Sequence, residues 1–156
     1  MPGFVSNHGQ VLLALQVLVK DLQPEELANE EVAIRQTWLF NNEPMRGVTI
    51  YDAGEQYSPG TCGTHDVGYV CGIIFVRGRD GDAALYSDQM IRWRELVRRR
   101  LTDKRLSVTI TNASLPSEHV CNVEKTGEDL TNAVKWPNWL IRKLTVVVWL
   151  REIPTS

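Results

Sequence analysis

The segment from Val67 to Arg77 constrains the fold more than any other part of this chain. Apolar side chains occupy both of its faces: Tyr69, Cys71, Ile73 and Phe75 on one, and Val70, Ile74 and Val76 on the other. Successive side chains of a β-strand point to opposite sides, so both sides of this strand require cover. The segment therefore predicts a central strand with packed structure on each face.

Two amphipathic helices are predicted around this strand. The first runs from His8 to Leu22, with Asn7 as its cap and Gln10 completing a capping-box pattern. Leu13 and Val17 widen its apolar stripe, which predicts burial on more than one side, by its own domain or by a neighbour. The second helix runs from Ala83 to Leu101. Its apolar stripe consists of Tyr86, Met90, Trp93, Val97 and Leu101.

Several further segments have the composition of strands. They are 32–38, 48–51, 106–111, 119–125 and 141–152. Between them, 41–44 is a turn, 53–66 is expected to be a long loop rich in glycine, and 126–137 is expected to be a polar insertion. Helices separated by consecutive strands predict an α+β fold in which a mostly antiparallel sheet of about five to six strands packs against two main helices. The 156 residues suit a single domain.

The formal charge of −2 hides a marked asymmetry along the chain. Residues 1–91 carry five basic and twelve acidic side chains, a net charge of −7, whereas 92–105 carries seven basic and two acidic, a net of +5. Three interpretations of the basic helix face are open. In order of preference, the face is solvated, contacts acidic residues 21–43 of another copy, or contacts nucleic acid. The contact residues for the last two interpretations are Arg92, Arg94, Arg98 and Arg99.

Neither a metal site nor a catalytic site is expected. Cys62 and His65 have the spacing of half a zinc site, which Cys71 and the His119-Val120-Cys121 segment would have to complete. Cys71 and Cys121 fall in predicted strands, however, and free cysteine is a common core residue. His65-Asp66 beside Cys62 lacks a nucleophile elbow, and no phosphate-binding or dinucleotide motif is present. We therefore expect no cofactor and no enzymatic activity.

Tryptophans lie on either side of Pro137, just before the last predicted strand. Exposed aromatic side chains at such positions are enriched at protein interfaces, which makes Trp136 and Trp139 candidate interface residues. The alternative is that both rings cover the edge of their own core. No stretch of about 20 apolar residues is present, and the first ten residues lack the charge of a signal peptide, so we expect synthesis in the cytoplasm with reduced cysteines.

The chain resembles the tail terminator, or tail-completion, proteins of the head–tail junction of tailed bacteriophages. The likeness is one of pattern, and four stretches carry it: Val11–Leu22, Val48–Tyr51, Gly72–Gly78 continuing into Trp93–Arg98, and Leu144–Glu152. The 53–66 loop and the 126–137 insertion depart from that pattern, and they could indicate another neck component.

The resemblance implies a structural virion protein. Such proteins form a ring, commonly a hexamer, on the last ring of the tail tube, where they stop tube growth and dock the tail to neck or connector proteins. The 53–66 loop would then reach a neighbour, and the basic helix would line a ring contact or the channel through which DNA passes. The alternative function is a small nucleic-acid-binding or regulatory domain that uses residues 92–105.

Overall fold

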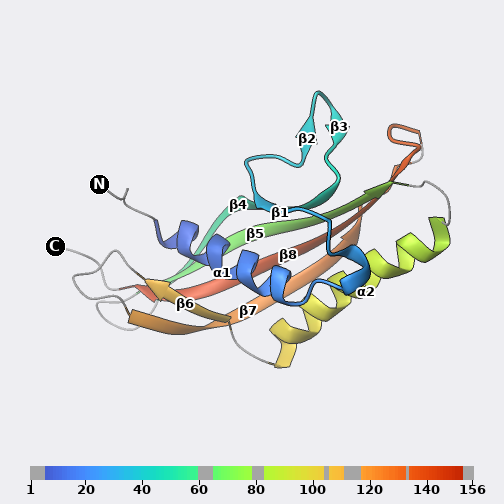
Figure 1. Ribbon diagram of the computed structural model, residues 1–156. Coiled ribbons are helices and arrows are strands. Elements are labelled where there is room, and N and C mark those ends of the chain that lie inside the picture. The colour runs from blue at the N-terminus through green and yellow to red at the C-terminus, as the bar shows by residue number, and fades with distance from the viewer. Residues whose placement is uncertain are drawn as a thin grey trace, which may run out of the picture.

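A computed structural model of the chain describes residues 6–59, 65–78, 83–103, 106–110, 117–132 and 134–152. The fold is α+β, as predicted, with a six-stranded sheet and a separate two-stranded hairpin (Figure 1). In chain order the elements are α1 (Asn7–Asp21), the short 3-10 helix η1 (Glu25–Leu27), β1 (Val32–Ile34), β2 (Leu39–Phe40), β3 (Glu43–Pro44), β4 (Gly47–Pro59), β5 (His65–Gly78), α2 (Ala83–Asp103), β6 (Leu106–Ile110), β7 (Ser117–Asp129) and β8 (Trp139–Glu152).

The strand order in the large sheet is β1-β4-β5-β8-β7-β6. β1 runs parallel to β4, and every other neighbouring pair is antiparallel. β5 lies between β4 and β8 over its whole length, which confirms the central strand predicted from its two apolar faces. β7 pairs through its first part with β6 and through the remainder with β8.

Both helices pack on one face of the sheet. The main core lies between them and this face, and it takes Tyr69, Cys71, Ile73 and Phe75 from β5. α1 contacts β1 at one edge of the sheet and β6 at the other, so the sheet must curve around this helix (Figure 1). Trp93 of α2 is fully buried, and its ring meets Phe75 edge-on at 5.5 Å between centroids.

A smaller core covers one end of the opposite face. Ile74 and Val76 of β5 pack there with Trp136 and Ile141, against the β2–β3 hairpin. Further along the same face, the ring of Tyr51 lies over Gly72, where a Cβ atom would come within 2.3 Å of it. Glycine at this position therefore permits the aromatic ring to cover the strand backbone.

The sequence predicted a long loop over 53–66, and this prediction is wrong for most of the segment. β4 continues to Pro59 and pairs with β5, which begins at His65, so only 60–64 lies outside the described residues. A bulge between Asp52 and Gly54 changes the register, and Gly54 takes a φ of 112° that suits glycine. Side chains from Asp52 to Tyr57 are all exposed. The sequence here therefore lacks the alternation of apolar and polar residues that indicates a strand.

Three other boundaries differ from prediction. The cap of α1 is Ser6, whose hydroxyl accepts a hydrogen bond from the Gly9 amide at 2.9 Å, and not Asn7. The strand predicted over 32–38 ends at Ile34, because the chain leaves the sheet there to form the hairpin. The 126–137 insertion is partly strand, since β7 continues to Asp129 opposite Arg142. The cap is a local hydrogen bond, whereas the extension of β7 reflects its pairing with β8.

The sequence predicted that α1 is buried on more than one side, but the described part of the chain leaves its outer side exposed. Leu13 is 44% exposed and Val17 is 67% exposed, while Val11, Leu15 and Val19 are fully buried. Cover by a neighbouring molecule, the other source that the sequence allowed, stays a prediction. Among the described residues, neither helix is long and apolar enough to span a membrane.

Candidate interaction surfaces

The arginines of α2 are largely engaged by their own chain. Glu95 forms ion pairs with Arg98 at 3.6 Å and with Arg99 at 3.0 Å, as helical spacing predicts. Asp88 and Arg92 have the same i,i+4 spacing, but no ion pair joins these two described residues. This helix face is therefore a partly neutralised, exposed surface.

Arg94 points away from the row of exposed arginines. Its Nη1 lies 3.4 Å from the carbonyl oxygen of Glu128 on β7, to which it donates. Burial, followed by repulsion from Arg142, lowers the pKa of Arg94 from its ordinary value. Arg94 is thus directed at its own sheet, and Arg92, Arg98 and Arg99 are the candidate contact residues that remain exposed.

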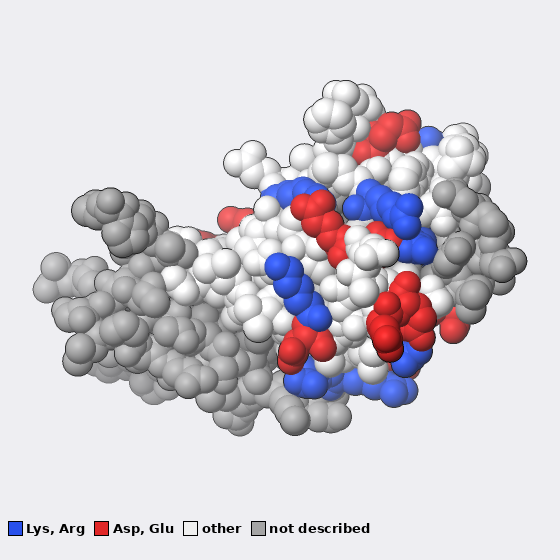
Figure 2. Space-filling view, viewed as in Figure 1, with Lys and Arg blue, Asp and Glu red and all other residues white. Residues whose placement is uncertain are grey.

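Part of the acidic charge between residues 21 and 43 is also neutralised within the chain. The carboxylate of Glu30 is buried, accepts hydrogen bonds from Nε and Nη2 of Arg46 at 3.1 and 2.9 Å, and also pairs with Arg77. Glu31 pairs with Arg35 at 3.0 Å. Figure 2 shows acidic and basic side chains interspersed on this face, so charges that are separated along the sequence are mixed in space.

The two candidate interface tryptophans have different surroundings. Trp136 is only 7% exposed, and its indole Nε1 donates to the carbonyl oxygen of Asn42 at 2.8 Å. Its ring meets Trp38 edge-on at 5.3 Å between centroids. Trp139 is half-buried against the same small core. Trp136 therefore helps to hold the β2–β3 hairpin and presents little surface to a partner.

The hairpin itself presents an aromatic side chain that the sequence analysis did not single out. Asn41 and Asn42 have positive φ angles of 51° and 62°, as a two-residue hairpin turn requires, and Phe40 beside them is 68% exposed. The nearby turn before β8 presents Val134, which is 95% exposed, and Lys135, whose Nζ lies 4.7 Å from the centre of the Trp136 ring. We call Phe40, Glu43, Val134 and Lys135 the hairpin end.

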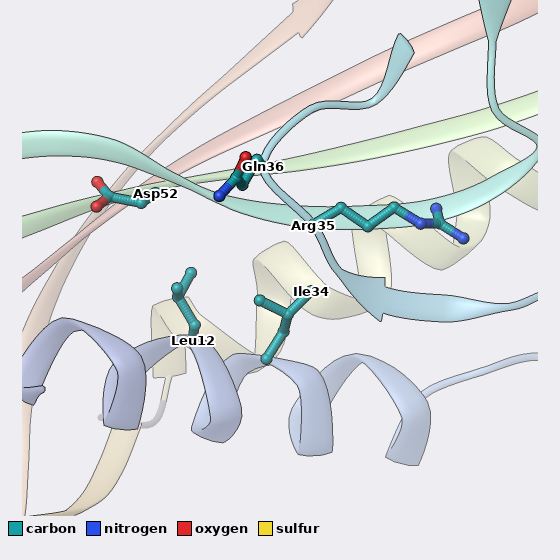
Figure 3. A pocket seen from close by; sticks show the side chains of 5 residues that line it. All are labelled: Leu12, Ile34, Arg35, Gln36 and Asp52. Carbon is teal, nitrogen blue, oxygen red and sulfur yellow. The ribbon is translucent and has the colours of Figure 1, made fainter. Parts of the chain in front are cut away.

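An open cleft of about 490 Å³ lies between α1 and the start of the sheet. It is lined by Leu12, Ile34, Arg35, Gln36 and Asp52 (Figure 3). Leu12 and Ile34 form an apolar part of its wall. Asp52 lies at one end, and the Arg35 side chain extends toward the other, where its Nη1 donates to Thr49 Oγ1 at 2.8 Å. The cleft thus combines an apolar centre with opposite charges at its ends.

A histidine, a cysteine and an aspartate meet beside this cleft. His8 Nε2 lies 3.5 Å from the Cys71 sulfur, and His8 Nδ1 lies 3.4 Å from Asp52 Oδ1, which is long for a hydrogen bond. Burial, followed by the charge of Asp52, raises the pKa of Cys71 to about 12. Cys71 has no exposed surface and remains a thiol, so the arrangement lacks an accessible nucleophile. The sequence spacing gave no signal of this long-range cluster.

No three described side chains of the ligating types are grouped as a metal site. Of the residues considered for zinc, Cys71 faces His8 in the core. Cys62 lies outside the described residues, as do the side chains of His65, His119 and Cys121. Among the residues weighed for zinc, Cys71 is therefore the one whose side chain the structure describes.

In the described part of the chain, the geometry thus offers apolar surface at the hairpin end, in the cleft beside α1 and on the outer side of α1 at Leu13 and Val17. Comparison of the chain with models of protein families gives no match, and comparison with curated proteins gives none either.

Proposed function

We propose that this protein is a structural component of a virion, acting at the head–tail junction of a tailed bacteriophage. In that role, copies of the chain form a ring, commonly a hexamer, that caps the tail tube and docks it to neck proteins. The sequence pattern supports the location. The surface of the molecule supports the part of the proposal that concerns self-association.

The uncovered Phe40 on a braced hairpin is the observation that carries the proposal. A large aromatic side chain that is 68% exposed at a protruding turn leaves most of its apolar surface in contact with water. The hairpin beneath it is nevertheless held by the indole of Trp136 and by the hydrogen bond from the Met45 amide to the Trp38 carbonyl at 2.9 Å. A rigid element with an apolar tip is suited to docking, because little conformational entropy is lost on binding.

The proposed surface replaces the 53–66 loop as the arm that reaches a neighbour. Most of that segment is paired in the sheet, whereas the β2–β3 hairpin projects from the molecule (Figure 1). Val17 on the outer side of α1, 67% exposed, supplies further uncovered apolar surface. Exposed aromatic and aliphatic side chains of this kind are typical of contacts between protein molecules.

A nucleic-acid-binding domain is the alternative, and α2 supports it less well. Glu95 is shared by Arg98 and Arg99, and Arg94 donates to the Glu128 carbonyl, so phosphate contacts would compete with existing partners. Salt-dependent DNA binding that is abolished by joint replacement of Arg94, Arg98 and Arg99 would favour this alternative over assembly.

The proposal is tested by measuring mass in solution and binding to tail components. Light scattering and sedimentation over a range of concentrations should show a discrete oligomer, either of the protein alone or on addition of tail tubes. Tail-tube and neck proteins from the same genome should bind the chain, and Phe40→Asp should weaken association at least tenfold. Tyr57→Asp is the matched control, because Tyr57 is an aromatic residue exposed to 72% on β4.

Two negative results together contradict the proposal. The first is a monomer at all concentrations, and the second is the absence of binding to tail-tube and neck proteins. Both are needed, because a terminator that assembles only on the tail would be monomeric when isolated.

A further inference from the structure

We propose that the hairpin end of one copy docks into the cleft beside α1 of a second copy of the same chain. This inference rests on the proposed self-association and specifies the two surfaces that make it. The two surfaces are different parts of the molecule, so the contact is head-to-tail. Repetition of such a contact closes into a ring if the rotation between copies permits it, and otherwise forms a filament.

The cleft has the size and lining to receive an aromatic side chain. Its volume of about 490 Å³ exceeds that of one phenyl ring, which leaves space for the Asn41 and Asn42 side chains beside Phe40. Ile34 is 37% exposed and Leu12 retains 9% exposure, so both present apolar surface to an incoming ring. Removal of Phe40, Ile34 and Leu12 surface from water would favour the contact.

The charges around the two surfaces are complementary. The hairpin end combines the apolar Phe40 with two charged side chains, the acidic Glu43 on the hairpin and the basic Lys135 on the turn before β8. The hydrogen bond from Trp136 to Asn42 joins these two segments. The cleft has an apolar centre between the basic Arg35 and the acidic Asp52, whose side chain is 61% exposed. Arg35 already pairs with Glu31, so docking can place Lys135 toward the exposed Asp52, which favours one orientation and disfavours the reverse.

One chain leaves both surfaces open at the same time. The cleft lies between α1 and β4, whereas the hairpin projects away from α1 (Figures 1 and 3). Phe40 is accordingly exposed, and no residue of the β2–β3 hairpin lines the cleft of the same chain. A second copy satisfies both surfaces, since it presents a cleft to the first hairpin and a hairpin to the next cleft.

The test uses full-length chains that lack one surface each. Phe40→Asp removes the apolar tip, and Ile34→Lys blocks the cleft; both residues are partly or largely exposed, so the fold should persist, as circular dichroism can verify. Each variant alone should associate at least tenfold more weakly than the unmodified chain. An equimolar mixture should form a 1:1 complex and nothing larger, because one variant retains the cleft and the other retains the hairpin.

A disulfide between copies gives an independent measurement. Phe40→Cys mixed with Ile34→Cys should form a crosslinked dimer under mild oxidation, whereas Tyr57→Cys mixed with Ile34→Cys should not. If the unmodified chain associates and Phe40→Asp leaves its association unchanged, this inference is wrong while the proposed self-association stands. If the chain binds tail tubes but the Phe40→Cys and Ile34→Cys variants form no crosslink either in solution or on the tubes, the contact between copies is likewise refuted, and the proposed location stands. Loss of both activities refutes the proposed function itself.

Discussion

At the level of single residues, burial decides the chemistry of Cys71. Its sulfur faces the His8 ring at 3.5 Å, and Asp52 lies 3.4 Å from the other ring nitrogen, an order that resembles a catalytic triad. Desolvation favours the neutral thiol, however, and the charge of Asp52 adds to that effect. The thiol donates to the Tyr69 carbonyl oxygen at 3.8 Å and also contacts His8 Nε2. The cluster thus attaches α1 to β5.

We expect Cys71 to resist thiol reagents in the folded protein. With a pKa of about 12, only about one molecule in ten thousand carries the reactive thiolate at pH 8. Alkylation at pH 8 followed by mass spectrometry of the Cys71 peptide should show negligible labelling, and labelling should become complete in denaturant. Rapid labelling of this peptide in native conditions would show that the thiol is accessible.

Trp136 acts at the same scale by connecting distant parts of the chain. Its indole bonds to Asn42, 94 residues earlier, and its ring packs on Trp38. A tryptophan beside a proline near a strand would also suit an interface, so its sequence position alone did not distinguish the two roles. The position of the hairpin determines that this ring is buried.

Trp136→Phe should lower the free energy of unfolding by about 2 kcal/mol, because the hydrogen bond to Asn42 is lost and the smaller phenyl ring leaves a cavity. Hydrogen exchange should also quicken at the Met45 amide, which bonds across the hairpin. Trp139→Phe is the control, since its indole nitrogen donates to no described residue. Equal effects of the two changes on the Met45 amide would contradict the assigned role of Trp136.

At the level of secondary-structure elements, polar contacts stabilise the turn between the end of β7 and the start of β8. Asp129 at the end of β7 accepts a hydrogen bond from the Thr131 amide at 2.9 Å and pairs with Arg142 of β8. Burial raises the pKa of Asp129, but the hydrogen bonds from Thr131 and the charge of Arg142 outweigh it and lower the pKa below its ordinary value. The ionised carboxylate therefore stabilises the folded arrangement of this turn.

Acid should weaken this turn. A carboxylate whose pKa is lower in the folded protein stabilises it fully above the pKa of the unfolded chain, and loses this effect as pH falls through the folded-state pKa. The difference in free energy of unfolding between the unmodified chain and Asp129→Asn should be constant above about pH 5 and shrink below about pH 4. Denaturant titrations between pH 3 and 7 measure it. A difference that does not change with pH would exclude Asp129 as the titrating group.

At the level of the whole molecule, the opposition between acidic and basic segments is largely resolved within one chain. Glu30 binds Arg46 and Arg77, Glu95 binds two arginines of its own helix, and the surface is mixed (Figure 2). The charge asymmetry of the sequence is thus a poor guide to how copies would meet. Apolar surface at Phe40 and Val17 is the feature that the fold leaves unsatisfied.

Association should therefore depend weakly on ionic strength. An assembly held by acidic residues 21–43 against the basic helix would dissociate as salt rises, because exposed charges are screened beyond about 10 Å at 0.1 M salt. Sedimentation at 0.1 and 0.5 M NaCl should show a change of less than tenfold in the association constant, and a combined Arg92→Gln, Arg98→Gln, Arg99→Gln variant should behave like the unmodified chain. Strong loss of association in either case would assign the contact to α2.

The sequence by itself determined the elements whose side-chain spacing records burial. The two-residue period of β5 predicted a central strand, and the stripe through Met90, Trp93 and Val97 predicted the buried face of α2. The α+β class follows from the order of such elements, because local spacing decides which faces require cover. The same reasoning failed for β4 beyond Tyr51, where the exposed side chains carry no period.

Only the tertiary structure decided which distant groups meet. The bond from Trp136 to Asn42, the burial of Glu30 between Arg46 and Arg77, and the approach of His8 to Cys71 each join segments that are far apart in the chain. Spacing along a sequence specifies the faces of one element, but not the register and curvature with which elements pack. For that reason the exposure of Phe40 and the cleft beside α1 became visible only in the folded molecule.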